Sequence, residues 1–391
     1  VINKWANLVE DMPWPTYPLY EFEYWWAPHL PNWIYRLSRP VHHDIPNQAE
    51  SIKNKKYGRD IFDACFRLAR YLRDNLRRAR FKQNTFSLFK QLLLKEGDVI
   101  FFPDVSKDDL FGLESFVRES TYANGIRWHL LFHHYLKDIV DCGVLDRISK
   151  NASVSFYSDT QDMSHMYGNS AKLEFHTLPI PHTVEDISES ICLRKHDPLT
   201  ILYAGEARVE KGFLHLPQIL NDLWQDYLAT GKIEFVIQAY ISRSAEVDTL
   251  LSARRELQAY PEEYVRLILN PLSLKEYETL LHVGSIILLL YDPVQYHLRS
   301  SGIFAEAASL GMPVIAPANT WMARQIELAS QVGPIGATYD SMSEMLSSIR
   351  RVINHYDLYR IAAQKHSLIW RSVHNATQLM DIIQKNSGTV Q

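Results

Sequence analysis

The segment YAGEARVEKGF (203–213) reads as the end of a strand followed by a glycine turn with two cations, before a helix. Where a strand turns into a helix, backbone N–H groups are left unpaired and the helix dipole adds partial positive charge at the same place. Gly205 permits a tight turn, and Arg208 and Lys211 add charge-assisted contacts, so we expect this loop to bind a diphosphate. The alternative is that the charges of this turn pair with one another in solvent.

A second candidate anion site lies in HLRSSGIFAEAASLG (297–311), where a cation, two hydroxyls and a glycine precede a helix expected over about 303–310. The early N–H groups of that helix would face an anion, and glycine would let a ligand approach the backbone. The alternative is an ordinary serine-capped helix whose glutamate completes a capping box. The residues expected to line this site are Arg299, Ser300, Ser301, Gly302, Ile303 and Glu306.

Short apolar strands alternate with helices on both sides of a polar stretch at 182–198, which indicates two successive α/β domains. Each would hold a parallel sheet, with its sites at the carboxyl ends of the strands. We expect domains over 1–185 and 198–365, followed by a C-terminal segment 366–391 that packs toward the N-terminal domain as one helix over 366–384. The expected strands are 97–104, 127–134, 153–160 and 173–181, then 199–206, 233–240, 265–270 and 285–292.

Bulk composition agrees with this organisation. A chain of 391 residues suits two domains, and 46% hydrophobic with 22% charged residues is typical of a globular protein. The net charge of −4 gives no reason to expect nucleic acid as a partner. Three cysteines without a CxxC pair argue against a zinc site or a disulfide framework and favour a reducing, cytoplasmic location.

GEARVEKGF, followed by RSSGIFAEAASLGMPVI, resembles the nucleotide-sugar-dependent glycosyltransferases of the GT-B fold, and within them the retaining family 4, glycosyl transferases group 1. The resemblance implies an α/β fold of two Rossmann-like domains that face each other across a cleft. It also implies a hexosyltransferase that uses a nucleoside diphosphate sugar, retains the anomeric configuration and needs no metal or further cofactor. Lys211 would hold the diphosphate and Glu306 the ribose. Arg208 stands two places beyond the family's usual arginine, where this chain has Glu206.

One departure from the family pattern concerns the donor sugar. The family has a second glutamate eight positions before the ribose glutamate, and this chain has Leu298 there. Arg299 or Asp292 could substitute. The departure supports an alternative in which a catalytically weak GT-B protein binds a nucleotide or glycan without turnover. A sugar-nucleotide 2-epimerase would need carboxylate bases in the cleft, and a phosphorylase a lysine for pyridoxal phosphate; the sequence singles out neither.

Three further groups of candidates complete the site. His133 in LLFHHYL follows an expected strand, and the resemblance places a histidine there beside the reacting sugar. Ser158 and Asp159 end another strand, where they would contact the acceptor or cap the next helix. Asn270 and Leu272 lie in the turn that receives the nucleobase in the family. A strand-end histidine is otherwise a common structural residue.

Two N-terminal features bear on the acceptor. A helix is expected over 57–95, with an apolar stripe that includes Leu76 and Ala79 and a row of cations over 67–82. That row is either a solvated face or a surface for the membrane, with the tryptophan-rich N-terminus at the headgroups. We therefore expect a glycan or lipid-linked acceptor, a place in polysaccharide biosynthesis, and a peripheral position on the inner face of the membrane. The tryptophans could equally stack on acceptor sugars or fill a core.

Overall fold

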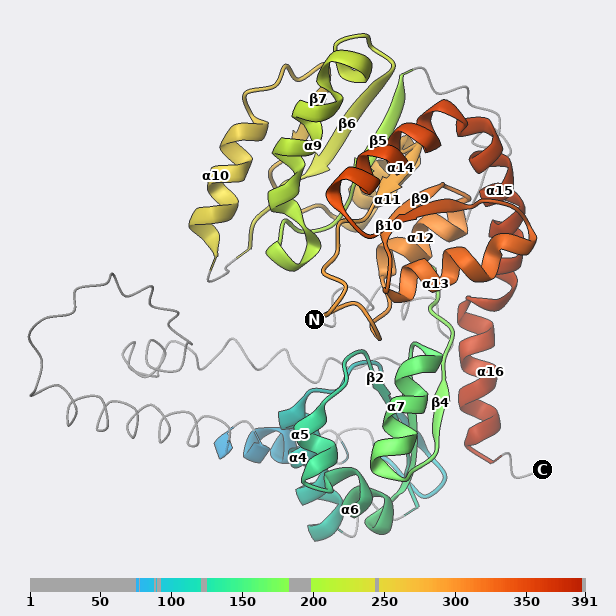
Figure 1. Cartoon of the computed structure of the whole chain (residues 1–391). Coiled ribbons are helices and arrows are strands. Elements are labelled where there is room, and N and C mark those ends of the chain that lie inside the picture. Colours follow the sequence, from blue (N-terminus) through green and yellow to red (C-terminus); the bar gives the residue numbers. More distant parts are fainter. Residues whose placement is uncertain are drawn as a thin grey trace, which may run out of the picture. The chain divides into compact units, whose positions relative to one another are not determined.

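The computed structural model describes residues 75–76, 78–87, 89, 93–120, 125–182, 198–242 and 246–388. The chain divides into two compact units, each with its own sheet (Figure 1). The first unit comprises Val1–Ser158 and Ser164–His176, and the second Asp159–Met163 and Thr177–Gln391. The tryptophan-rich N-terminus and most of the basic row over 67–82 lie outside the described residues.

The first unit contains a four-stranded sheet in the order β1-β2-β3-β4. Its strands are β1 (Val99–Phe102), β2 (Arg127–Phe132), β3 (Ser153–Ser158) and β4 (Phe175–Thr177). β2 runs parallel to both β1 and β3, as a strand–helix alternation requires. The helices between them are α4 (Lys107–Glu119), α5 (Lys137–Asp141), α6 (Val144–Asn151) and α7 (Gln161–Ala171).

Aromatic packing around Trp128 of β2 holds this unit together. The fully buried indole stacks against Phe89 and Phe102, at centroid distances of 5.6 and 5.9 Å, and meets the edge of Phe116 at 6.0 Å. Burial of a large aromatic side chain contributes several kcal/mol of hydrophobic free energy, roughly 25 cal/mol for each Å² removed from water. The helical residue Phe89 and helix α4 are thereby fixed on one face of the sheet.

The helix over 78–87 uses a different face from the one that its sequence pattern predicts. Phe81 is buried, with its ring 5.8 Å from that of Phe102, whereas Leu76 and Ala79 are exposed. The predicted stripe through Leu76 and Ala79 is therefore wrong for this part of the helix. The core selects the larger aromatic rings, because they bury more apolar area per residue than leucine or alanine.

The second unit has a six-stranded sheet in the order β10-β9-β8-β5-β6-β7, and all its pairings are parallel. The chain starts in the middle at β5, winds outward to β7, and returns to β8 on the other side of β5. This is the doubly wound order, with a topological switch point between β5 and β8. The strands are β5 (Leu199–Tyr203), β6 (Ile233–Gln238), β7 (Val265–Ile268), β8 (Ile286–Leu288), β9 (Val314–Pro317) and β10 (Gly336–Tyr339).

Helices cover the buried sheet, so its strands are continuous apolar runs. Ile201 and Tyr203 of β5 belong to the hydrophobic cluster that also contains residues of α9 (Leu216–Leu223), α10 (Val247–Leu257) and α14 (Met342–Asn354). Leu202 points to the opposite face, because side chains alternate along a strand. The remaining helices are α11 (Leu274–Val283), α12 (Gly302–Leu310), α13 (Trp321–Leu328), α15 (Tyr356–Val373) and α16 (Ala376–Asn386), with 3-10 turns η4 (Val209–Lys211), η5 (Phe213–His215) and η7 (Ala329–Gln331) and a π-helical turn η6 (Trp224–Leu228).

The C-terminal segment forms two helices instead of the single helix expected over 366–384. α15 ends at Val373, and α16 begins at Ala376 after the cap Asn375, whose side chain accepts a hydrogen bond from Gln378 N. Asparagine is a strong N-cap, because its oxygen satisfies an otherwise unpaired helix N–H. Among the described residues, no helix is both long enough and apolar enough to cross a bilayer.

Candidate functional site

The two segments that were expected to bind an anion meet at Gly205, just after β5. A Cβ at Gly205 would lie 2.7 Å from Ile303 Cδ1 in the first turn of α12 and 2.8 Å from Lys211 Nζ. Its φ of +95° is in the region that favours glycine, and its N–H donates to Gln238 Oε1 at the end of β6 over 2.7 Å. Loop and helix therefore form one site at the carboxyl ends of β5 and β8, the switch point of the sheet.

Lys211 is a buried cation within this site. Only 4% of the residue is exposed, and its carbonyl accepts a hydrogen bond from the Tyr203 hydroxyl over 3.2 Å. The next residue, Gly212, has a φ of +73°, and a Cβ there would lie 2.1 Å from the carbonyl oxygen of Leu290. The loop after β5 is thus pressed against the segment that leaves β8, which fixes the position of Lys211.

Arg208 pairs with two carboxylates of its own loop. Its Nη1 lies 3.0 Å from Glu210 Oε1, and its Nε lies 3.7 Å from Glu206 Oε2. Glu206 also accepts a hydrogen bond from Ser242 N over 3.1 Å. The interpretation that the charges of this turn pair with one another is therefore confirmed for Arg208.

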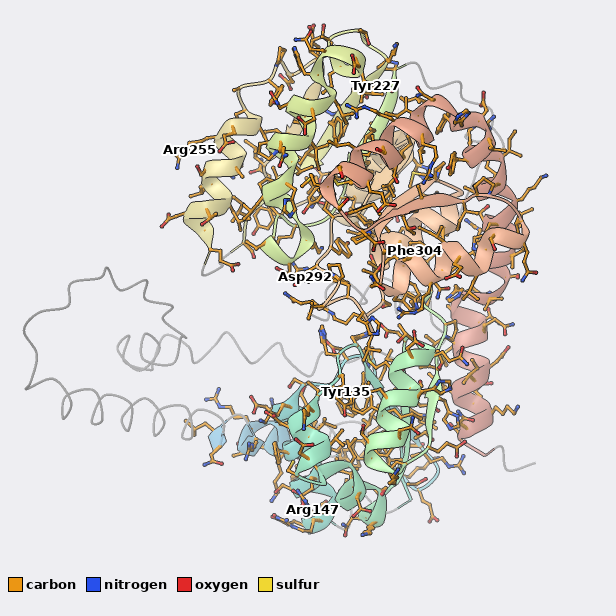
Figure 2. All side chains as sticks on the ribbon, in the orientation of Figure 1. Tyr135, Arg147, Tyr227, Arg255, Asp292 and Phe304 are labelled. Atoms are coloured by element: carbon orange, nitrogen blue, oxygen red, sulfur yellow. The ribbon has the colours of Figure 1, made fainter. Side chains whose placement is uncertain are left out.

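Ser301 is the N-cap of α12 and fixes the direction of its first turn. Its hydroxyl accepts from Phe304 N over 3.2 Å and donates to the Tyr291 hydroxyl over 3.4 Å. Phe304, labelled in Figure 2, is buried, and its ring lies 5.4 Å from that of Trp321 and 5.7 Å from that of Trp370. The cap hydrogen bond and the packing of Phe304 therefore fix the start of α12, whose unpaired N–H groups face the site.

Gly302 and Glu306 occupy different environments on α12. Gly302 is exposed, and a Cβ there would touch nothing within 4 Å, so the backbone is open at this point. Glu306 is 6% exposed and lies near Tyr277 of α11. Burial raises the pKa of the Tyr277 phenol, and the negative charge of Glu306 raises it further. The predicted capping box does not form, because the residue three positions after the cap is Phe304.

The segment between β8 and α12 carries a pair of buried tyrosines that the sequence analysis did not single out. The rings of Tyr291 and Tyr296 lie 4.3 Å apart, and the guanidinium of Arg299 lies 4.6 Å from the centroid of Tyr296. The polar side chains of Tyr291 and of Gln238 stand at or just beyond the ends of buried strands. That position is the signal that could have identified them.

Leu298, which stands where the family has its second glutamate, contacts the segment that contains Asp159 and Thr160 through its backbone. The carbonyl of Leu298 accepts from Thr160 Oγ1 over 2.7 Å, and Ser300 donates to Asp159 Oδ2 over 2.5 Å. Asp292 accepts from Val294 N and from the Gln295 side chain, so it closes its own turn. Asp159, expected on the acceptor side, is therefore bound to the segment that leads into α12.

Ser158 lies in the interior of the first unit. It is fully buried, and its hydroxyl lies 2.8 Å from that of Ser164, which donates to the carbonyl of His176. A buried hydroxyl with these partners is typical of a structural group, and the expected acceptor contact of Ser158 stays a prediction. Sequence position alone could not show this burial, because the strand end and the sheet interior differ by a single residue.

His133 and the expected base-binding turn keep their positions at strand ends. His133 is half-buried just after β2, and its Nε2 lies 2.8 Å from the carbonyl oxygen of Pro103. Asn270 is exposed and Leu272 half-buried in the turn between β7 and α11. Within the described ranges, no group of three or more His, Cys, Asp or Glu side chains is arranged to hold a metal ion.

Comparison with solved structures identifies the fold. The chain is similar to sucrose-phosphate synthase from Thermosynechococcus elongatus, with a TM-score of 0.57, 12% identity and coverage of 78% of this chain and 76% of that one. It is similar to trehalose-6-phosphate synthase OtsA, with a TM-score of 0.60, 12% identity and coverage of 82% and 77%. A UDP-forming α,α-trehalose-phosphate synthase from Burkholderia xenovorans in complex with glucose-6-phosphate gives a TM-score of 0.59, 14% identity and coverage of 80% and 78%.

These similarities show that the chain has the GT-B glycosyltransferase fold, as the sequence analysis predicted. No family model matches the sequence, and no curated protein matches it. The agreement is therefore one of architecture, carried by strand order and helix placement at low sequence identity.

Proposed function

We propose that this chain transfers a sugar from a nucleoside diphosphate donor to an acceptor hydroxyl, with retention of the anomeric configuration. The observation that carries the proposal is the convergence of the β5 loop, Lys211 and the first turn of α12 at Gly205, at the switch point of a doubly wound sheet. A helix N-terminus beside a buried lysine is suited to a diphosphate, because both present positive charge to its oxygens.

Charge on the departing diphosphate is the main quantity that this site would stabilise. As the bond between the anomeric carbon and the phosphate oxygen breaks, negative charge grows on that oxygen, where Lys211 and the N–H groups at Gly302 and Ile303 would meet it. The acceptor oxygen forms the new glycosidic bond on the same face of the sugar. Its proton passes to the departing phosphate oxygen, so the scheme balances without an enzyme nucleophile.

Other residues would bind the remaining parts of the donor. Glu306 would accept the ribose hydroxyls, and its burial near Tyr277 supports a role for a carboxylate that is shielded from water. The turn with Asn270 and Leu272 would receive the nucleobase, and His133 would orient the sugar. Because protein cations would supply the charge stabilisation, the reaction as proposed needs no metal or further cofactor. Activity that persists in excess EDTA is the expected result.

The acceptor is proposed to be a glycan or a lipid-linked sugar, in keeping with polysaccharide biosynthesis at the inner face of the membrane. The trehalose-phosphate synthase with glucose-6-phosphate makes sugar phosphates a necessary part of any acceptor panel. Within the basic row, Arg78 lies 3.9 Å from the Phe111 ring and Lys82 pairs with Glu119. In this part of the row, these two cations thus have partners within the first unit.

The first test is calorimetric titration of UDP, GDP and ADP into the wild type and Lys211→Ala. One nucleotide should bind, and the variant should lose about 1.5–3 kcal/mol, or roughly 10- to 150-fold in affinity. Lys232→Ala is the matched control, because Lys232 is exposed and donates to the Asp226 carbonyl. Failure of all three nucleotides to bind to the folded wild type contradicts the proposal.

Turnover separates the enzyme from the alternative of a nucleotide- or glycan-binding protein, which Leu298 supports. Hydrolysis of the matching nucleotide sugar, followed by NMR, reports both rate and anomeric configuration. Release of the nucleotide with a retained anomer supports the proposal, whereas tight binding without any turnover across donors and acceptors supports the binding protein.

A further inference from the structure

Two arginines flank the same pair of buried tyrosines. Tyr291 and Tyr296 are each 3% exposed, and burial raises the pKa of both phenols. Arg208 and Arg299 both act against that rise, so each guanidinium lies within electrostatic reach of both hydroxyls. Both cations therefore lie near the tyrosine pair, and they differ in their surroundings.

The charge of Arg208 is already compensated. Glu210 lies 3.0 Å from one of its nitrogens and Glu206 lies 3.7 Å from another, so the three side chains together carry a net negative charge. A diphosphate placed at Arg208 would also meet these two carboxylates, and like charges at short range repel. Arg208 is therefore better placed to hold its loop than to attract an anion.

Arg299 has a different environment. Its guanidinium stacks over Tyr296 at 4.6 Å, and among the described residues no carboxylate forms an ion pair with it. Two carboxylates that belong to or contact the same segment have other partners, because Asp159 accepts from Ser300 and Asp292 closes its own turn. The residue is half-buried, so its charge is only partly screened by water and still open to a ligand.

Tyr296 is a fixed platform for that guanidinium. Its N–H donates to the Asp292 carbonyl over 3.0 Å, and its carbonyl accepts from Trp321 N over 3.0 Å. Asp292 N in turn donates to the Glu210 carbonyl over 2.8 Å, which joins this segment to the β5 loop. The tyrosine on which Arg299 stacks is thereby tied to the loop that carries Lys211.

Lys211 approaches the tyrosine pair from the other ring. Its Nζ lies 5.8 Å from the centroid of Tyr291, while Arg299 lies over Tyr296. Two cations at neighbouring rings, beside the start of α12, would supply positive charge to both phosphate groups of a nucleoside diphosphate.

We propose that Arg299, and not Arg208, is the second cation that holds the donor diphosphate beside Lys211. The inference rests on the proposed function and refines it. Arg299 donates hydrogen bonds to the phosphate oxygens, and it stabilises the negative charge that the leaving oxygen gains when its bond to the anomeric carbon breaks. Arg208 holds the β5 loop through Glu206 and Glu210.

The test compares the affinity for a nucleoside diphosphate in matched arginine variants. The probe is whichever of UDP, GDP and ADP binds to the wild type. Arg299→Ala should weaken binding by about tenfold or more, and Arg208→Ala by a smaller factor, which arises from the loosened loop and its unpaired glutamates. Arg299→Lys should recover part of the affinity, because it restores charge without the planar stack. Arg255→Ala, at an exposed site on α10 (Figure 2), should leave the affinity unchanged.

Each other outcome has a definite meaning. An Arg208→Ala loss equal to or larger than that of Arg299→Ala overturns the inference. So does an Arg299→Ala variant that binds the nucleoside diphosphate normally and loses affinity only for donors with a charged sugar, since Arg299 would then contact the sugar. If an alanine variant does not fold, Arg299→Gln and Arg208→Gln give the same comparison. Absence of nucleotide binding in the wild type is a failure of the proposed function instead.

Discussion

Lys211 Nζ lies 2.8 Å from the point that a Cβ on Gly205 would occupy. The lysine can take this position because residue 205 has no side chain. The two residues are six positions apart, and the loop between them returns the lysine to the end of β5. Glycine at position 205 permits the positive φ of the loop, and the course of the loop in turn sets the position of the Lys211 ammonium group.

Gly205→Ala should weaken nucleotide binding by about tenfold or more, because the methyl group displaces Lys211 and Ile303. The φ of +95° adds backbone strain of about 1–2 kcal/mol. The control is Gly231→Ala, where φ is +67° and nothing lies within 4 Å of the added Cβ. Calorimetric titration and thermal unfolding of both variants separate the effects. Equal nucleotide affinities of the two variants would show that the contact with Lys211 has no bearing on binding.

Gly212→Ala should destabilise the second unit much more than Gly231→Ala. The added Cβ would lie 2.1 Å from the Leu290 carbonyl oxygen, which is backbone and cannot rotate away. We expect a loss of about 3 kcal/mol or more in the free energy of unfolding, against about 1–2 kcal/mol for the control, which has the strain without the collision. Denaturant unfolding measures both values. Similar losses in the two variants would mean that the loop after β5 moves away from the segment after β8 at little cost in free energy.

Much of the sheet could be predicted from the sequence, because short apolar strands and their turns are local signals. The predicted strand 199–206 is observed as β5 (Leu199–Tyr203), and the helix expected over about 303–310 is observed as α12 (Gly302–Leu310). Parallel strands deliver the loops that follow them to one edge, so Lys211 and the start of α12 could be expected near each other. That they meet at one glycine depends on β5 lying beside β8, which no local pattern encodes.

Side-chain pairing could not be predicted in the same way. Arg208 has Glu206, Glu210 and a possible ligand within reach, and the sequence does not show that the glutamates hold it. Ser158 looks like a polar strand end, yet Ser164 pairs with it inside the unit. The break before Asn375 did have a signal, since asparagine followed by a helical run is a common cap, but amphipathic periodicity continues through it.

Ser301→Ala should lower both stability and nucleotide affinity. The variant loses the cap hydrogen bond to Phe304 N, worth about 1 kcal/mol, and the contact with Tyr291 that orients the first turn of α12. Ser341→Ala is the matched control, because Ser341 caps α14 through Glu344 N and lies in another helix. We expect similar falls in melting temperature and a several-fold affinity loss for Ser301→Ala alone. An unchanged affinity in that variant would remove the start of α12 from the binding site.

Acid should destabilise the second unit through His374. Its Nδ1 accepts a hydrogen bond from Ile180 N over 3.0 Å, and burial, with His182 and His366 nearby, lowers its pKa from 6.5 to about 4. The unfolded chain therefore binds this proton at a higher pH than the folded one, so stability is complete above about pH 6.5 and falls as the pH drops toward 4. His374→Gln should be less stable than the wild type at pH 7.5, because it loses the stacking on Trp370, yet decline less between these pH values. Chemical unfolding at a series of pH values gives both slopes, and parallel slopes would assign the acid sensitivity to other groups.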